Sequence, residues 1–289
     1  MPMGLNLSSL PAPLRDDLTG FVENLGPLAI CAVVFAGLAL LTKGKAAIAD
    51  ARAAAGEARI NLTILILGQI AVAPVITVFI LALTALLRSY GLGLDTTWLW
   101  DKIGQWPTLL AAVVIGDFIG YWRHRAQHLK ALWPAHAIHH SDTRLHWLSL
   151  ERMHPLDQFG SAFDTVVLGA LGLPFWALAG NVFVRHYWGY LIHADLPWDL
   201  GVFGRVMNTP IMHRWHHARD VEGPGHNFAT VFSVWDRLFG TYHAPGPCLA
   251  PLGVREEMGR GVSGQYLHPF KVAGRAIRPR PASTDLALD

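Results

Sequence analysis

The spacing of its histidines constrains this chain more than any other feature. His124 and His128 stand four residues apart, and two H-x-x-H-H patterns follow. The first pattern consists of His136, His139 and His140, and the second of His213, His216 and His217. On a helix, residues three or four apart share a face, with Cβ atoms about 5–6 Å apart. Since histidine is the commonest metal ligand among side chains, these eight imidazoles predict a site for two metal ions, at roughly four protein ligands each.

Chance is the alternative explanation, because the 289-residue chain has 15 histidines and a lone histidine is usually a surface or core residue. The same chelating pattern occurs twice, and a pair of histidines spaced by four accompanies it. This combination favours metal binding. Imidazole suits zinc, copper, iron and nickel alike, so the spacing does not choose the metal.

Composition indicates a membrane protein. Hydrophobic residues make up 52% of the chain and charged residues 15%, against roughly 25% charged residues in soluble domains. The formal charge of +2, without a basic stripe, argues against a nucleic-acid partner. Cys31 and Cys248 cannot build a disulfide framework. The first 19 residues are polar and charged, unlike the apolar core of a signal peptide.

Four segments are expected to enter the membrane. Gly26–Thr42 is uncharged and apolar, and Leu62–Leu87 runs 26 residues without a charge, about 39 Å of helix. Trp106–Trp122 is a third apolar segment, interrupted by Asp117. Residues 160–193 are expected to form a hairpin bent near Pro174, because a single crossing would separate the last histidine pattern from the others.

The connector at residues 43–59 carries four basic residues, which places it in the cytoplasm by the positive-inside rule. The third segment then returns to the cytoplasm with His124 and His128. The predicted fold is an all-α integral membrane protein with about four membrane-embedded helical segments and a cytoplasmic histidine-rich helical cap.

Three regions are expected along the chain. Residues 1–20 form an N-terminal arm, residues 21–243 a membrane domain with its catalytic core at 113–242, and residues 244–289 a tail. The tail is expected to be solvated, with its QYLHPF segment, residues 265–270, able to pack back on the domain.

The segments HRAQH, HAIHH, HRWHH and WDRLFGTY together resemble the fatty acid hydroxylase / sterol desaturase superfamily of integral-membrane, non-haem di-iron enzymes. RMHPLD at 152–157 and LIHADLP at 191–197 also match its pattern, and the likeness covers roughly residues 113–242. The resemblance implies two iron ions as cofactors, O2 as co-substrate and His193 as an additional ligand. It implies hydroxylation of an unactivated C–H bond in a lipid-like substrate, such as a fatty acyl lipid, a sterol or a carotenoid.

Five further residues are candidates for an outer role around the metal centre: Asp117, His146, His154, His226 and Asn227. Asp117 shares a helical face with His124 and can act on that ring through Tyr121 or a water, or else pair with a neighbouring polar group. Asn227 is expected to hydrogen-bond a ligand imidazole. His154 is expected to be a ligand or to contact one, while His146 and His226 are candidate outer ligands or proton relays. No catalytic residue beyond the metal centre is predicted.

The sequence leaves alternatives open. Desaturation of the same substrates is the nearest one, and no residue separates it from hydroxylation. A di-zinc membrane hydrolase would use a metal-bound hydroxide, and a metal transporter would place its ligands near the midplane of its spans. Because the chain has no haem-binding HPGG segment and no Gly-rich nucleotide fingerprint, the electron donor is expected to be a separate protein, cytochrome b5-like or a ferredoxin with its reductase.

Overall fold

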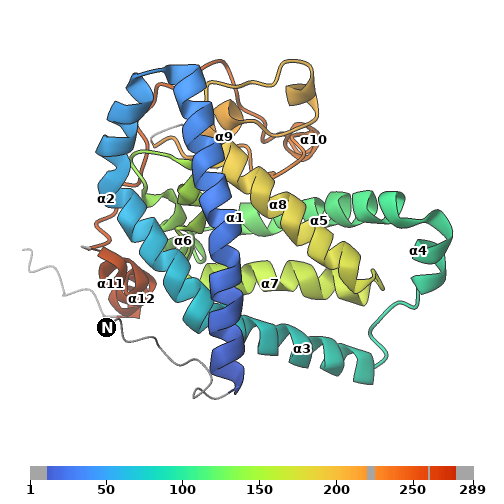
Figure 1. Cartoon of the computed structure of the whole chain (residues 1–289). Coiled ribbons are helices and arrows are strands. Elements are labelled where there is room, and N and C mark those ends of the chain that lie inside the picture. Colours follow the sequence, from blue (N-terminus) through green and yellow to red (C-terminus); the bar gives the residue numbers. More distant parts are fainter. Residues whose placement is uncertain (1–11, 220–224, 260, 278–289) are drawn as a thin grey trace, which may run out of the picture.

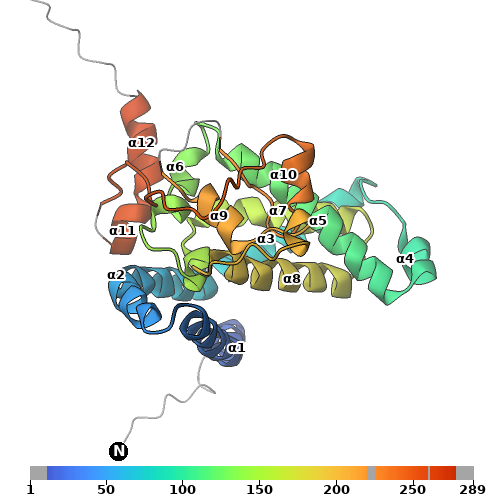
Figure 2. The same cartoon turned by 90° about the horizontal axis from the view of Figure 1, so that it is seen from above.

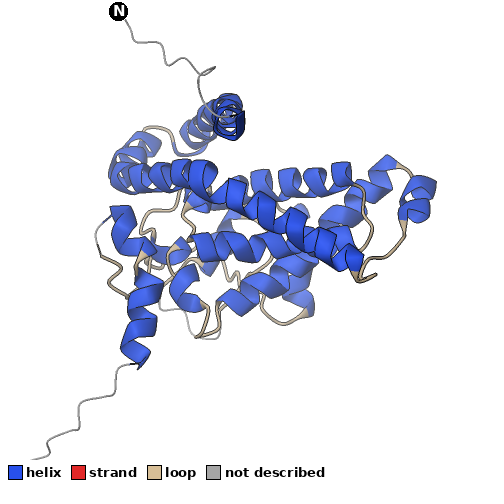
Figure 3. Ribbon diagram, turned by 90° about the horizontal axis from the view of Figure 1, so that it is seen from below, coloured by secondary structure: helices blue, strands red, loops and turns tan. Residues whose placement is uncertain are grey.

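Helices and loops make up the part of the chain that the structure describes, residues 12–219, 225–259 and 261–277 of a computed structural model (Figure 3). Within these residues the only β-pairing is two isolated bridges, Met207 with Phe232 and Ala218 with Leu252. The prediction of an all-α chain is therefore confirmed. The longer helices are α1 (Ala12–Lys43), α2 (Ala46–Leu67), α3 (Ala73–Ser89), α5 (Gln105–Gln127), α7 (Pro155–Ala170) and α8 (Phe175–His193). The shorter ones are α4 (Thr97–Ile103), α6 (Trp133–His136), α9 (Pro210–His216), α10 (Val234–Leu238), α11 (Gly261–Tyr266) and α12 (His268–Ile277), with 3₁₀ turns at His139–Ser141, Trp147–Glu151 and Phe203–Arg205.

Helix α1 begins earlier than the sequence predicted. The apolar segment was expected to start at Gly26, but residues 12–20, assigned to the N-terminal arm, are already helical. Pro13 stands in the first turn of this helix. Backbone N–H groups in a first turn have no partner within the helix, so the N–H that proline lacks costs no helical hydrogen bond. The remainder of the expected arm, residues 1–11, lies outside the described residues.

Helices α2 and α3 are joined without a loop by one π-helical turn, Gly68–Val72. Pro74 follows directly as the second residue of α3. Since π-bulges and prolines both disturb the regular hydrogen-bond ladder, this is where the chain bends between α2 and α3 in Figure 1. The predicted segment Leu62–Leu87 therefore lies in one bent helix.

Two helical stretches are long and apolar enough to cross a membrane, Leu25–Lys43 and Ala46–Ser89. In their most apolar windows only 6% and 0% of the residues are buried inside the protein, whereas the core helix of a soluble protein would be mostly buried. Figure 2 shows α1 at one side of the molecule, away from α5 and α10. Their exposed leucines and valines therefore require an apolar surrounding.

Helices α7 and α8 form the predicted hairpin. The chain turns at residues 171–174, and Pro174 is the residue before the first turn of α8. Both helices pack against α5, and α7 also packs against α3. In Figure 1 the turn lies at the end of these helices that is remote from α6 and α9. The hairpin therefore returns the chain to the end where the histidine motifs lie.

Buried ion pairs join α5, α7 and α8. Asp164 of α7 accepts from Arg123 of α5 at 3.0 Å and from Arg185 of α8 at 3.0 Å. Arg185 also lies 3.7 Å from Asp117 of α5. Charges inside apolar helices are costly unless they are paired, so this network fixes how the three helices meet.

Two glycines let α8 approach α5. A Cβ at Gly116 would collide with the side chain of Asn181, and a Cβ at Gly120 would collide with the guanidinium of Arg185. Asn181 is 1% exposed, so it has little room to move. Small residues four apart on one helix face permit this kind of close packing between membrane helices.

The tail packs back on the domain, as the sequence allowed. Helices α11 and α12 contact α2 and α6 respectively. Within the QYLHPF segment, the backbone carbonyl of Tyr266 lies 3.1 Å from Nε2 of His154. Residues 278–289 of the expected tail lie outside the described residues.

We predict that Gly120→Ala destabilises the protein by about 1–3 kcal/mol, because the new methyl group displaces Arg185 from its two carboxylate partners. Gly169→Ala is the matched control, since its Cβ would meet only Leu178 at an ordinary 3.9 Å. Thermal unfolding of both variants in the same detergent measures the effect. Equal unfolding temperatures for the two variants would contradict the packing described above.

Candidate metal centre

Nine histidines converge in two adjacent groups. The first group contains His124, His128, His136, His140 and His216, and the second contains His139, His193, His213 and His217. Within each group, one ring nitrogen from every histidine lies within 4.8 Å of the others. The groups touch, because the rings of His140 and His217 stack with centroids 4.4 Å apart. These nine are the residues predicted as ligands, and the described structure brings all of them together.

Each H-x-x-H-H motif contributes to both groups. His136 and His140, four residues apart, enter the first group, while His139 between them enters the second. In the second motif the division is the opposite. His213 and His217 enter the second group, and His216 enters the first. The two motifs therefore cross-link the two candidate metal positions.

Backbone carbonyls set the orientation of three rings. The Nδ1 atom of His124 donates to the carbonyl of Phe228 at 2.7 Å, that of His216 to the carbonyl of His226 at 2.6 Å, and that of His193 to the carbonyl of Gly189 at 2.7 Å. A ring that donates through Nδ1 presents an unprotonated Nε2, the atom that binds a metal.

A carboxylate orients a fourth ring. Nδ1 of His136 donates to Asp157 at 2.7 Å, and Gln127 donates to the other carboxylate oxygen. The carboxylate of Asp157 is itself buried between these two donors. Asp157 therefore fixes His136 with a charge-assisted hydrogen bond.

Hydrogen bonds among the described residues do not pair all of the histidine nitrogens that face inward. In the second group, Nε2 of His193 lies 3.1 Å from that of His139 and 3.0 Å from that of His213. In the first group, Nε2 of His124 and of His216 is buried without a hydrogen-bond partner among the described residues. Ligands at about 2.0–2.1 Å from one ion lie a little more than 3 Å apart, so a cation fits this arrangement.

Burial keeps the rings neutral. It lowers the pKa of His139, His140, His213 and His217 well below the ordinary histidine value, and the neighbouring imidazoles lower these pKa values further. Burial likewise lowers the pKa of His216 to about 3. Neutral imidazoles keep their lone pairs for a metal near neutral pH. The donor set therefore suits first-row transition metals.

Asp117 does not orient a histidine. Its carboxylate accepts from the backbone N–H groups of Thr230, Val231 and Phe232 at 3.2, 3.0 and 2.8 Å. The predicted link to His124 through Tyr121 is not formed, because the hydroxyl of Tyr121 pairs with Thr241 at 2.9 Å. Asp117 instead holds a loop whose backbone donors would otherwise be buried without acceptors.

Asn227 also bonds to backbone. Its amide donates to the carbonyls of Met212 and His243, at 2.8 and 2.6 Å, and accepts from the N–H of His243. The predicted hydrogen bond to a ligand imidazole is therefore not formed. With φ at +55°, Asn227 occupies the left-handed region that asparagine tolerates better than most residues, and it fastens this loop to α9.

His154 is not a ligand in this structure. Its Nδ1 accepts from the N–H of Leu156 at 3.1 Å at the start of α7, and its Nε2 reaches the carbonyl of Tyr266. Both nitrogens are therefore used in capping and packing. Neither histidine group includes the ring of His146 or of His226. His146 lies 3.3 Å from the amide of Asn61, and His226 contributes its carbonyl.

Sequence reasoning missed two carboxylates that position the ligands. Asp157 stood in the RMHPLD segment, and Asp236 in WDRLFGTY. Asp236 accepts from the N–H groups of Phe228 and Ala229 at 2.7 and 3.0 Å, and so holds the carbonyl that orients His124. Each aspartate stands in a segment that holds none of the nine clustered histidines, and this was the signal available from the sequence.

The sequence of the core matches a known family. A family model described as fatty acid hydroxylase matches residues 109–241. The chain is 33% identical over 181 residues to an ornithine lipid hydroxylase, OlsE, of Rhizobium tropici, covering 59% of this chain and 54% of that one. It is 33% identical over 144 residues to the alkylglycerol monooxygenase of Danio rerio, covering 50% of this chain and 31% of the relative.

A third relative is the very-long-chain aldehyde decarbonylase GL1-11 of Oryza sativa, 31% identical over 151 residues, 47% of this chain and 54% of that protein. The chain thus spans between a third and about half of the length of the relatives it matches. No solved structure matches it. Residues 109–241, which match the fatty acid hydroxylase family model, carry all nine clustered histidines.

Proposed function

We propose that this chain is an O2-dependent membrane hydroxylase of a lipid, with two iron ions held by the nine clustered histidines. The observation that carries the proposal is the pair of adjacent imidazole groups, in which Nε2 of His124, His128 and His216 is buried without a hydrogen-bond partner among the described residues. The relatives add that this family includes enzymes named for the hydroxylation or monooxygenation of ornithine lipids and alkylglycerols.

Iron, when bound, would supply the activation of O2 and the removal of hydrogen from a C–H bond. The chain's own groups would hold and orient the iron ions. The clustered histidines, among them His140 and His216, would provide the donor nitrogens. Asp157 and the carbonyl of Phe228 fix the ring orientations of His136 and His124. Since most of these rings are 2–6% exposed, the surrounding helices keep bulk water from the reacting atoms. Desaturation remains the alternative within the same chemistry.

We propose further that α5 and the α7–α8 hairpin enter the membrane together with α1 and α2–α3. Large apolar side chains remain exposed on the hairpin, with Phe163 49% and Trp176 44% exposed. Trp98 and Trp106, 64% and 81% exposed, lie near the end away from the histidines, where they suit an interfacial belt.

Contacts of the basic connector support a cytoplasmic metal centre. Lys43 pairs with Asp50 and with Asp195, and Asp195 also pairs with Arg214 of α9 at 2.7 Å. The connector therefore lies beside the histidine motifs, on the side that the positive-inside rule assigns to the cytoplasm. A separate electron-donor protein would dock on this side.

We predict that His139→Ala or His216→Ala lowers bound iron from about two ions per chain to about one, because each change removes a donor from a different group. His226→Ala is the control, since only the backbone carbonyl of His226 contacts a ligand ring. Metal analysis of the purified proteins is the measurement. Unchanged iron in both ligand variants would refute the assignment of ligands.

Lipid profiling of a host with and without the chain tests the activity. Expression together with a reducing system is expected to produce lipids heavier by one oxygen atom, and His139→Ala is expected to abolish them. Products lighter by two hydrogen atoms would instead establish desaturation. Hydrolysed lipids that form without O2 would favour the zinc hydrolase.

Topology is tested with reporter tags placed after Lys130 and after Tyr242. Both tags are expected to report the cytoplasm, because the hairpin returns the chain to the side it left. A tag inserted at Gly93, in the loop between α3 and α4, serves as the control and is expected to report the opposite side. If the first two tags lie on opposite sides, the proposed embedding of α7 and α8 is wrong.

A further inference from the structure

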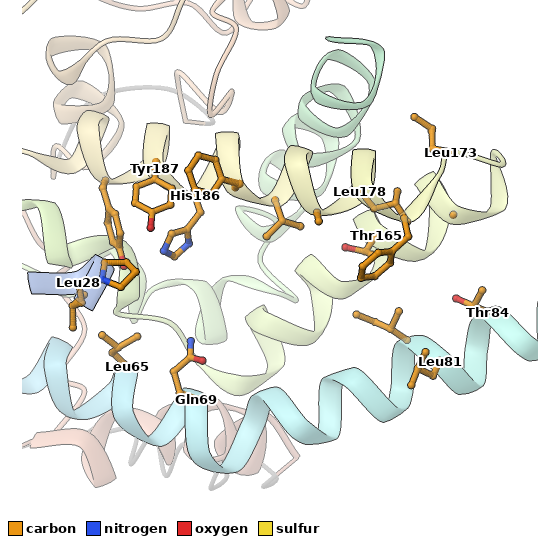
Figure 4. Close-up of a pocket in the computed structure, with 18 of the residues that line it drawn as sticks. Leu28, Leu65, Gln69, Leu81, Thr84, Thr165, Leu173, Leu178, His186 and Tyr187 are labelled. Atoms are coloured by element: carbon orange, nitrogen blue, oxygen red, sulfur yellow. The ribbon is translucent and has the colours of Figure 1, made fainter. Parts of the chain in front are cut away.

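A cavity of about 970 Å³ lies between α1, the α2–α3 helix, α7 and α8 (Figure 4). Most of its wall is aliphatic or aromatic, with Leu65 and Leu81 on one side and Leu178 and Val182 on the other. A cavity of this size and character suits one long apolar chain.

The cavity follows one face of α8 toward the metal centre. Leu178, Val182, His186 and Tyr190 line it at spacings of four, which keeps them on a single helical face. Tyr190 stands three residues before His193, a member of the second histidine group. The cavity thus ends about one helical turn, roughly 5 Å along α8, from a candidate metal ligand.

Polar side chains face one another across this cavity at its histidine end. Figure 4 shows Gln69 directed from the α2–α3 helix toward His186 and Tyr187, which descend from α8. Gln69 lies in the π-helical turn and belongs to the uncharged stretch Leu62–Leu87. Gln69 is exposed at the wall of the cavity rather than buried among its neighbours. An amide that faces an apolar surrounding at membrane depth is costly, so this position suits a polar group from a bound molecule.

Glu151 holds the aromatic side of this polar site in place. The hydroxyl of Tyr190 donates to Oε1 of Glu151 at 2.5 Å, and Nε2 of His186 lies 3.4 Å from the same oxygen. The ring of His186 also packs edge-on against Tyr190, with centroids 4.5 Å apart. The side chain of His186 remains 41% exposed, which leaves it able to contact a ligand.

We propose that Gln69, His186 and Tyr187 bind the uncharged hydrogen-bonding group of an amphiphilic substrate whose apolar chain fills the cavity. The three residues offer an amide, an imidazole and a phenol, which match an amide, ester, ether or hydroxyl group. Among the described residues, no lysine or arginine lines this end of the cavity, whereas Arg88 lines the opposite end.

The inference rests on the proposed function and sharpens it, because the histidine centre is taken as the oxidising centre. His186 precedes His193 by two helical turns, about 10 Å. The polar group is therefore bound close to the metal centre, and the apolar chain extends away from it. Oxidation is directed to atoms near the polar group rather than to the far end of the chain.

Binding of N-oleoylethanolamide, a single-chain amphiphile with an uncharged amide, tests the proposal. Purified, metal-loaded protein in nanodiscs is titrated with the labelled probe. Gln69→Leu and His186→Phe are each expected to weaken binding by about tenfold, the usual effect of one lost hydrogen bond to a buried group. Gln105→Leu is the matched control, since Gln105 lies exposed at the start of α5, outside the cavity lining, and it is expected to bind like the wild type.

Two results would overturn the inference. Equal binding by Gln69→Leu, His186→Phe and Gln105→Leu would mean that the polar site does not recognise the probe. Weakened binding in Arg88→Leu alone would mean that the head group binds at the opposite end. The iron content of each variant keeps this test separate from the proposed function, because the cavity variants are expected to retain wild-type iron. Normal probe binding by a wild type that oxidises no lipid would refute the function and leave the binding site standing.

Discussion

The structure depends on the meeting of nine imidazoles in one space, where several ring nitrogens have no hydrogen-bond partner among the described residues. A buried nitrogen lone pair without a donor is destabilising, and here several lone pairs point at the same two positions. A bound cation would relieve such an arrangement by accepting these lone pairs. Because the rings come from four separate segments of the chain, metal binding would contribute directly to folding.

The surrounding helices serve this meeting point. The charged contacts of Asp164 with Arg123 and Arg185 set α5, α7 and α8 against one another, and the turn before Pro174 brings His193 back to the end where α5 delivers His124. Near the centre, Asn61 of α2 donates to Asp142, and Glu57 accepts from the backbone of Thr143 and Arg144. The bent α2–α3 helix therefore supports the histidine loop at one end and lines the lipid-sized cavity at the other.

Spacing predicted eight of the nine histidines that gather, because residues three or four apart on a helix share a face, and the family resemblance added His193. It did not predict that His139 and His216 would each enter the other group from their neighbours, since that division depends on how the 3₁₀ turn at His139–Ser141 and α9 pack in three dimensions. Asp117, Asn227 and His154 looked like partners for ligands, yet all three bond to backbone groups. Loops that carry ligands contain many backbone donors and acceptors, and the nearest polar side chains satisfy these first. The π-turn that presents Gln69 was likewise invisible in a uniformly apolar stretch.

Sequence and geometry together thus define a centre, a scaffold and a cavity that leads toward the centre. The family match covers the part of the chain that holds the ligands, and the helices before it contribute much of the cavity wall. Substrate choice is therefore expected to vary with α1 and the α2–α3 helix while the metal chemistry stays the same.

Anomalous diffraction at the iron absorption edge, from crystals of the iron-loaded protein, tests the central claim most directly. Two peaks are expected, one among the five histidines of the first group and one among the four of the second. A single peak, or peaks outside both groups, would contradict the account.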